Sequence, residues 1–258
     1  MGHFEKFLQL HQQTSPLLLG NIWDVQSARM FEQNGYKAIG TSSQALANAF
    51  GYDDGENVPF ELVLQLAKKA VESVKIPLSV DIEGGFAVNI DNVVTNIKKL
   101  HDAGVAGINL EDSFAKPERR IMPAAEFRKR LFAITNQLTR ENVRIFVNVR
   151  TDGFLLGMPD ALSQSIARAQ AYETAGANGI FVPCITKSKD IQAVVAATSL
   201  PVNVMCMPAL PDFNALQKLG VKRISMGPFV FNKVYEHMGA LAQEISANGS
   251  FTSIFSNL

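Results

Sequence analysis

The sequence predicts a single (β/α)8 TIM barrel that spans residues 1–258. Short apolar runs alternate with amphipathic stretches eight times, and similar joints precede several of the runs: NGYKAIG, AGVAGIN, AGANGIF and LGVKRIS. The runs are almost continuously apolar, as the strands of a parallel sheet covered on both faces must be. The chain length is also typical of this barrel. A doubly wound open sheet is the alternative, but no GxGxxG turn follows any expected strand.

Local signals place the eight strand-helix units. Apolar residues at helical spacing mark the helices, as at Val93, Ile97 and Leu100. A glycine follows four of the helices, where it can adopt the left-handed conformation that ends a helix. The expected strands are 17–23, 38–42, 77–83, 106–110, 144–149, 179–182, 201–205 and 223–226. The expected helices are 27–34, 59–74, 91–103, 124–138, 160–175, 189–198, 212–219 and 229–245.

Composition argues against several classes of protein. The formal net charge is zero and the pI is near 6.9, which argues against the basic stripe of a nucleic-acid binder. The start, MGHFEKFLQLHQQ, lacks the apolar core of a signal peptide, and no apolar run approaches the roughly 20 residues of a membrane span. Cys184 and Cys206 fit free thiols in a reducing compartment. We therefore expect a cytoplasmic protein without nucleic-acid or membrane partners.

The stretch PLSVDIEGGF (77–86) carries two acids at the end of an expected strand. Residues i and i+2 of a strand point the same way, so Asp81 and Glu83 are expected to share one face. Burying two like charges there costs several kcal/mol each, roughly, unless an opposite charge offsets it. A divalent cation is one such offset. The alternative is a pair of solvated loop acids.

Polar groups follow nearly every expected strand, at the end where barrel enzymes hold their active sites. Asp81, Glu83 and Glu111, from adjacent strands, could bind one hard cation. Mg²⁺ fits because it keeps several waters and needs only one or two direct carboxylates. None of the four histidines falls at a strand end, which disfavours zinc.

Other strand-end residues suit a small anionic substrate. Arg150 offers a fork for a carboxylate, although it could instead only neutralise the acids. Asn148 and Asn203 could donate hydrogen bonds to the substrate, or could merely cap their strands. Ser42 and Ser43 could also contact the substrate, or could be plain turn residues. Trp23 could form an aromatic wall, although a lone Trp more often fills a core.

The chain resembles the isocitrate lyase/phosphoenolpyruvate mutase superfamily, in its phosphonomutase-like branch. The motifs that carry the resemblance are NIWDVQSAR (21–29), GTSS (40–43), GYDDGE (51–56), VDIEGGF (80–86), GINLEDS (107–113), VNVRTD (147–152), GIFVPC (179–184), PVNVM (201–205) and RISMGP (223–228). They run in family order from residue 21 to about residue 230. Together they are far more specific than any one of them.

The resemblance implies Mg²⁺, or Mn²⁺ as a substitute, near Asp81, with Glu83 and Glu111 acting mostly through waters. It implies catalytic roles for Asp54, Glu111 and Arg150. It also implies that the backbone around Ser42 and Ser43 cradles an oxo-carboxylate, which Arg150 and Asn203 contact further. The segment at about 229–258 is expected to pack on a partner subunit, in a homodimer or homotetramer with swapped helices.

The segment 113–123 departs from the family. The isocitrate and methylisocitrate lyases carry a Lys-Cys-Gly-His loop there and the mutases a Lys-Thr-Asn pattern, whereas this chain reads FAKPERRIMP. The resemblance therefore implies a Mg²⁺-dependent lyase or decarboxylase that cleaves a C–C bond in a small 2-oxo or 2-hydroxy (di)carboxylate through an enolate-like intermediate. Phosphonate P–C chemistry and an inactive carboxylate-binding barrel are the alternatives. The segment is either a lid or a surface loop, and the candidates for a missing acid are Lys116, Glu118, Arg119 and Arg120.

Overall fold

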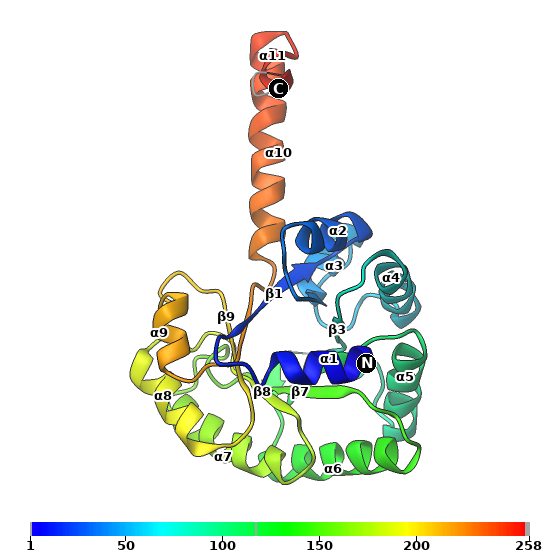
Figure 1. The fold of residues 1–258 in the computed structure, drawn as a ribbon, viewed down its shortest axis with the longest axis vertical. Coiled ribbons are helices and arrows are strands. Elements are labelled where there is room, and N and C mark those ends of the chain that lie inside the picture. Colours follow the sequence, from blue (N-terminus) through cyan, green and yellow to red (C-terminus); the bar gives the residue numbers. More distant parts are fainter. Residues whose placement is uncertain (1, 117, 256–258) are drawn as a thin grey trace.

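Eight parallel strands close into a barrel in the computed structural model, which describes residues 2–116 and 118–255. They follow one another around the barrel in chain order, and the last pairs with the first. Figure 1 shows the helices set around this barrel. The strands are β1 (Leu17–Ile22), β2 (Ala38–Thr41), β3 (Leu78–Asp81), β4 (Gly107–Glu111), β7 (Phe146–Arg150), β8 (Gly179–Phe181), β9 (Val202–Met205) and β10 (Arg223–Ser225). The predicted (β/α)8 fold is confirmed.

The eight expected helices also form, with ends that differ from the prediction by a few residues. All of them except α10 present apolar side chains to the strands; in α5, for example, Val93, Ile97 and Leu100 are fully buried. Helix α2 begins at a capping box, in which the Asp24 carboxylate accepts the Ser27 N–H at 2.6 Å. The helices are α2 (Val25–Gln33), α4 (Phe60–Ser73), α5 (Ile90–Asp102), α6 (Ala124–Arg140), α7 (Ala161–Glu173), α8 (Ser188–Ala197), α9 (Phe213–Lys218) and α10 (Phe229–Asn248).

Five further elements are present: α1 (His3–Leu10), α3 (Ser43–Phe50), β5 (Ser113–Phe114), β6 (Arg120–Ile121) and α11 (Thr252–Phe255). Helix α3 starts at Ser42, whose hydroxyl accepts the Ala45 N–H at 3.3 Å, and stops at Gly51 in the left-handed conformation. Strands β5 and β6 form an antiparallel hairpin inside the segment 113–123. Residue 117 of that segment lies outside the described residues.

The barrel interior is polar, although its strands read as apolar runs. Asn148 on β7 donates to Asn109 on β4 at 2.9 Å and to Asn203 on β9 at 3.2 Å, so the contacts cross the interior. Arg223 is buried beside them, and burial lowers its pKa to about 9. Gly179 makes room for this network, because a Cβ there would lie 2.8 Å from Asn148 Oδ1. Many apolar strand residues point outward to the helices, which is why the runs look apolar in sequence, whereas Leu17, Leu19 and Phe146 pack with Phe7 at the N-terminal end of the barrel.

Helix α1 closes the N-terminal end of the barrel with aromatic contacts. Phe7 meets Phe146 edge to face at 5.4 Å, and the His11 ring stacks on Phe146 at 4.3 Å. His11 Nδ1 lies 2.8 Å from the Phe7 carbonyl, and its Nε2 has no hydrogen-bond partner among the described residues. Burial, and then the positive charge of Arg223, lower the pKa of His11 from 6.5 to about 3.

Stability is expected to fall in acid because of His11. The unfolded chain takes up a proton near pH 6.5, whereas the folded chain leaves His11 neutral down to about pH 3. Since the unfolded state binds more protons between these values, the contribution of His11 to the free energy of unfolding falls by about 1.4 kcal/mol per pH unit on acidification. Urea unfolding of the wild type and of His11→Phe at several pH values measures it. The difference between the two curves should change with pH below 6.5, and parallel curves contradict the prediction.

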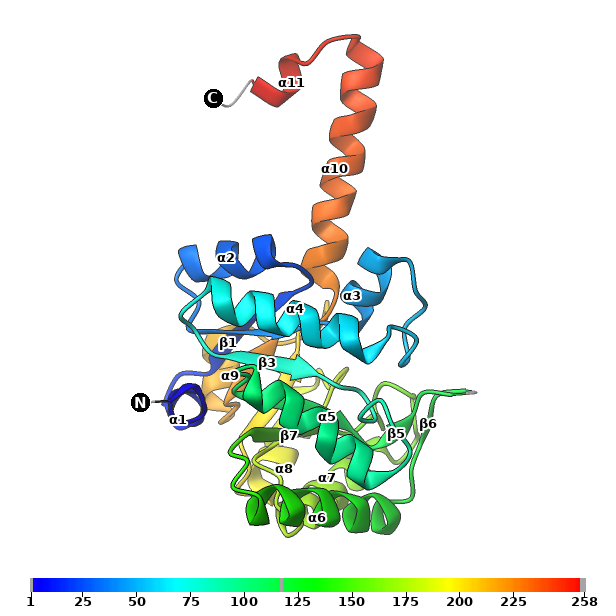
Figure 2. The ribbon, with the colours of Figure 1, turned by 90° about the vertical axis from the view of Figure 1, so that its right-hand side faces the viewer.

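Helix α10 projects away from the barrel rather than lying against it (Figures 1 and 2). Within this described helix only Phe231 is buried, and it packs edge to face on Trp23 at 5.2 Å. Val234, Tyr235 and Met238 are 49%, 43% and 54% exposed. None of the helices in the described part of the chain is long and apolar enough to span a membrane.

Candidate active site

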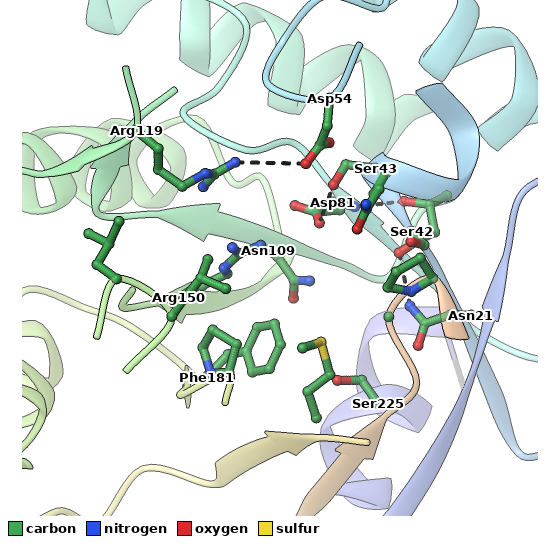
Figure 3. Close-up of a pocket in the computed structure, with 18 residues that line it drawn as sticks. Asn21, Ser42, Ser43, Asp54, Asp81, Asn109, Arg119, Arg150, Phe181 and Ser225 are labelled. Atoms are coloured by element: carbon green, nitrogen blue, oxygen red, sulfur yellow. Dashed lines mark hydrogen bonds and ion pairs between the residues drawn. The ribbon is translucent and has the colours of Figure 1, made fainter. Parts of the chain in front are cut away.

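A cavity of 340 Å³ opens at the C-terminal ends of the strands (Figure 3). Each barrel strand contributes one of the lining residues Asn21, Thr41, Asp81, Asn109, Arg150, Phe181, Met205 and Ser225. The predicted site residues that line it are Ser42, Ser43, Asp54, Asp81 and Arg150. Its volume lies near the lower end for ligand pockets and suits a small substrate.

Asp81 is the last residue of β3 and faces the cavity. Its Oδ2 accepts a hydrogen bond from Ser43 Oγ at 3.2 Å, and its own N–H donates to Thr41 Oγ1 at 2.8 Å. The side chain is thus held by Ser43 at the start of α3, and the backbone by Thr41 at the end of β2. Burial raises the pKa of Asp81, with nearby Arg150 working in the opposite direction.

Glu83 lies past the end of β3, so the strand alternation expected to relate it to Asp81 does not apply. Its backbone has a φ of 48°, in the left-handed region that is costly for a side-chain-bearing residue. Its side chain turns behind the cavity, where Oε1 accepts the Glu56 N–H at 2.9 Å and Oε2 has no hydrogen-bond partner among the described residues. Burial, then the charges of Glu111 and Asp81, raise the pKa of Glu83 to about 9.

Glu111 and Arg150 form a buried ion pair. The Arg150 guanidinium lies 2.6 Å from Glu111 Oε1 through Nη1 and 2.6 Å from Asp152 Oδ1 through Nε. Burial raises the pKa of Glu111 to about 7, against the opposing effect of Arg150. Burial alone would lower the pKa of Arg150, but Glu111 and Asp152 hold it above its ordinary value. Arg150 therefore neutralises acids and also faces the cavity, and its contact with a substrate carboxylate stays a prediction.

Arg119, on the hairpin β5–β6, reaches into the same cluster and lines the cavity. Its Nη1 lies 2.6 Å from Glu111 Oε2 and 2.9 Å from Asp152 Oδ2. Burial alone would lower the pKa of Arg119, but these carboxylates hold it above its ordinary value. Arg119 is thus a fixed positive charge in this arrangement and a poor proton donor. The sequence named it only among four candidates in the segment.

Asn148 and Asn203 lie one layer below the cavity and do not line it. Both are 1% exposed; Asn148 contacts Asn109, whose side chain does face the cavity, and Asn203 contacts Asn148. Asn109 Oδ1 accepts from Asn148 at 2.9 Å and from Arg223 Nη2 at 3.3 Å. With its oxygen engaged below, the Asn109 amide can present its NH₂ group to a bound anion. Alternation along β4 between Ile108 and Leu110 is the sequence signal that points Asn109 inward.

Ser42 and Ser43 mark the start of α3 at the edge of the cavity. The first N–H groups of a helix have no acceptor within the helix, and the helix dipole makes this end positive. The arrangement suits a carboxylate, as the resemblance implied. Trp23 lies elsewhere: it packs with Ala45 and Phe231 outside this cavity, which is the core-filling alternative.

Comparisons with known proteins agree with this geometry. Residues 7–246 match the family model described as phosphoenolpyruvate phosphomutase. The chain belongs to the isocitrate lyase/phosphoenolpyruvate mutase superfamily. This is a superfamily of lyases and mutases.

Four similar proteins illustrate the range. An uncharacterised Mycobacterium tuberculosis protein is 35% identical over 86% of this chain and 81% of its own length. A Burkholderia cenocepacia structure, provisionally described as a phosphonomutase, has a TM-score of 0.88 at 35% identity and covers 93% of this chain and 99% of its own. The oxaloacetate decarboxylase of Bradyrhizobium sp. (strain ORS 278) is 30% identical over 71% of this chain and 64% of its own length. A phosphonopyruvate hydrolase solved with oxalate and Mg²⁺ shares the fold, with a TM-score of 0.88 at 21% identity over 100% of this chain and 92% of its own.

The acids of this superfamily member fit a divalent cation that is held by one direct carboxylate and otherwise through waters. In the described part of the chain, no three Asp, Glu, His or Cys side chains are grouped closely enough to ligate one ion directly. Asp81 alone faces the cavity from the predicted metal set, whereas Glu83 and Glu111 lie behind it. The buried Oε2 of Glu83, which has no hydrogen-bond partner among the described residues, is an acceptor for an ion-bound water. One direct carboxylate and a shell of waters is the arrangement that Mg²⁺ tolerates.

Proposed function

We propose that this chain is a Mg²⁺-dependent lyase acting on a small 2-oxo or 2-hydroxy (di)carboxylate, with decarboxylation of an oxaloacetate-like acid as its leading reaction. One observation carries the proposal: Asp81, Arg150 and the start of α3 face the same small cavity. A carboxylate for a cation, a guanidinium and a positive helix end are the groups that a 2-oxo acid requires.

The chain's own residues would bind and orient the substrate. The α3 N-terminus and the NH₂ group of Asn109 would hold one carboxylate, and Arg150 would hold a second anionic group. Loss of CO₂ from the 3-position leaves the bond's electron pair on the carbon next to the carbonyl, and a proton from water completes the product. A bound Mg²⁺ would supply positive charge beside the carbonyl oxygen, where negative charge develops.

Decarboxylation is favoured over the isocitrate-type cleavages by the hairpin. FAKPERRIMP carries neither Cys nor His, and its cavity-facing Arg119 is a poor acid. Decarboxylation needs no acid side chain from this loop, because its last proton can come from water. The 30% identity to an oxaloacetate decarboxylase supports this choice.

The test is a substrate panel with purified protein. Oxaloacetate and a set of 2-oxo and substituted malic acids are incubated with Mg²⁺, with Mn²⁺ and with EDTA, and CO₂ release and pyruvate are followed. We expect metal-dependent turnover of at least one of these acids. If every acid stays unchanged while calorimetry detects tight binding, the chain is an inactive carboxylate-binding barrel.

Phosphonate P–C chemistry is the second candidate. The match to the phosphoenolpyruvate phosphomutase family model and the 35% identity to a provisionally described phosphonomutase favour it. The hairpin lacks the Lys-Thr-Asn pattern of the mutases, and phosphonate chemistry therefore ranks second. Phosphorus NMR of phosphonopyruvate with the protein and Mg²⁺ separates the two candidates, because only P–C chemistry moves the phosphorus resonance.

We also propose that α10 packs on a second copy of this chain, in a homodimer or homotetramer. Helices in proteins gain most of their stability from packing of an apolar face, yet this helix of 20 residues exposes apolar side chains. An apolar groove of 620 Å³ lies between α10 and α2, lined by residues that include Met30, Tyr235 and Met238. A second copy's α10 would cover it. Residues 256–258 of the predicted swapped segment lie outside the described residues.

Sedimentation equilibrium tests this assembly. The wild type is expected as a dimer or tetramer at micromolar concentration, and Val234→Asp is expected to shift it toward monomer by placing a charge in the apolar contact. Glu236→Ala, a change of a side chain that is 68% exposed on the same helix, is the matched control. A monomeric wild type contradicts the proposal.

A further inference from the structure

Arg119 lies among more carboxylates than a guanidinium needs. Its Nη1 contacts Glu111 and Asp152 at 2.6 and 2.9 Å. Its Nη2 lies 4.0 Å from both Asp54 Oδ2 and Glu83 Oε2. Figure 3 shows the Arg119 side chain pointing toward Asp54 across the upper part of the cavity. One guanidinium thus lies between acids from the loops after α3 and β3 and acids at or just past the ends of β4 and β7.

Arg119 differs from Arg150, the other guanidinium in this cluster. Arg150 comes from a barrel strand, and its side chain is 13% exposed. Arg119 comes from the hairpin between β5 and β6, and its side chain is 23% exposed. The hairpin is anchored at its base, where the Met122 N–H donates to the Asp112 carbonyl at 2.8 Å. Nearer the tip, the hairpin is held by the contacts of Arg119 and by a separate hydrogen bond of 3.1 Å from Lys116 Nζ to the Glu56 carbonyl.

The carboxylates that hold Arg119 are those that a divalent cation near Asp81 would draw on. Glu83 and Glu111 belong to the predicted metal set, and Asp54 lines the same cavity. A guanidinium and a dication beside the same acids repel each other, and the low dielectric of a buried site strengthens that repulsion. The two cations therefore compete for one pool of negative charge.

We propose that Arg119 is a tethered cation that holds the acid cluster in the metal-free protein and is displaced when a divalent cation binds. Metal loading and movement of the β5–β6 hairpin are then coupled, because the same side chain takes part in both. By thermodynamic linkage, whatever frees Arg119 from the cluster also tightens metal binding. This inference rests on the metal site of the proposed function.

Mn²⁺ binding, followed by the electron paramagnetic resonance signal of the free ion, tests the competition without any substrate. The proteins are the wild type, Arg119→Gln and Arg120→Gln. Arg120 is the matched control, because it is the next residue on the hairpin and its guanidinium stacks over the Phe114 ring at 4.4 Å. We expect Arg119→Gln to bind Mn²⁺ at least about tenfold more tightly than the wild type and Arg120→Gln to stay within about twofold. Arg119→Lys, which keeps a positive charge but lacks the guanidinium fork, should fall between.

The outcomes separate this inference from the proposed function. Mn²⁺ binding of equal or lower affinity in Arg119→Gln overturns the competition and leaves the metal site standing. No Mn²⁺ binding to any of the proteins overturns the metal site and the competition with it. Hydrogen exchange of the wild type needs no variant: amides of the hairpin should exchange faster when Mn²⁺ is added. Unchanged exchange there overturns the coupling to hairpin movement.

Discussion

Replacing Asp81 with alanine is expected to lower metal-dependent turnover by at least about 10²–10³-fold while the barrel stays folded. Asp81 is the predicted ligand that faces the cavity directly, so no other carboxylate of the predicted set can take its place without moving. The fold does not depend on this carboxylate, because burial raises the pKa of Asp81 and its charge is a cost to the metal-free protein at neutral pH. The two groups that lose an acceptor are Ser43 Oγ and the Glu83 N–H.

The measurements are turnover, metal-induced thermal stabilisation and urea unfolding. Mg²⁺ should raise the Tm of the wild type by mass action and leave that of Asp81→Ala unchanged. The free energy of unfolding without metal should stay within about 2 kcal/mol of the wild type, since the lost hydrogen bonds and the relieved charge oppose each other. Asp212→Ala is the control: it removes the carboxylate that accepts the Ala215 N–H at the start of α9 and should leave turnover intact. Full turnover in Asp81→Ala contradicts the metal assignment.

The fold could be predicted from sequence because its signals are local. Apolar spacing in α5 and the glycine that follows it are read within a dozen residues, and the same pattern repeats around the barrel. Helix α3 was missed although Ser42 is a favoured N-cap residue and Ala45, Leu46 and Ala47 are good helix formers. Ser42 and Ser43 directly follow or end a predicted strand, so they were interpreted as turn residues, and no element was predicted between that strand and the helix at 59–74. The missed helix matters for function, since the start of α3 borders the cavity.

The sequence could predict the site residues that end strands, but not those that lie in loops or on the hairpin. Asp81 and Arg150 end β3 and β7, and parallel strands bring their ends to one mouth. Glu83 was misplaced because its left-handed backbone breaks the alternation, and the sequence does not display that angle. Arg119 could not be ranked above its neighbours, because its partners are fixed by how the hairpin folds over the cluster. Such contacts depend on tertiary geometry, whereas the sequence shows only that the segment is charged.

Replacing Arg168 with methionine is expected to lower the free energy of unfolding by roughly 3–5 kcal/mol. Arg168 is 3% exposed; its Nη1 donates to Asp112 Oδ2 at 2.9 Å, and its Nη2 donates to the Met122 carbonyl at 2.9 Å. Tyr172 also donates to Asp112 Oδ2, at 2.7 Å. Burial raises the pKa of Asp112, and Arg168 opposes that rise. Without the guanidinium, a fully buried carboxylate keeps only neutral donors, and the anchor of the β5–β6 hairpin loses its partner at Met122.

A double-mutant cycle with Asp112→Asn separates this pair from general damage to packing. If the cost of Arg168→Met comes from the stranded Asp112 charge, neutralising Asp112 in the same protein should recover at least about 1 kcal/mol of it. Lys69→Ala provides the contrast, since the Lys69–Glu72 pair has a similar distance of 2.9 Å but both side chains are 63% exposed. Its loss should cost less than about 1 kcal/mol, because water already screens the two charges. Additive effects of the Arg168 and Asp112 changes, or equal costs at the buried and exposed pairs, contradict the view that burial sets the strength of this network.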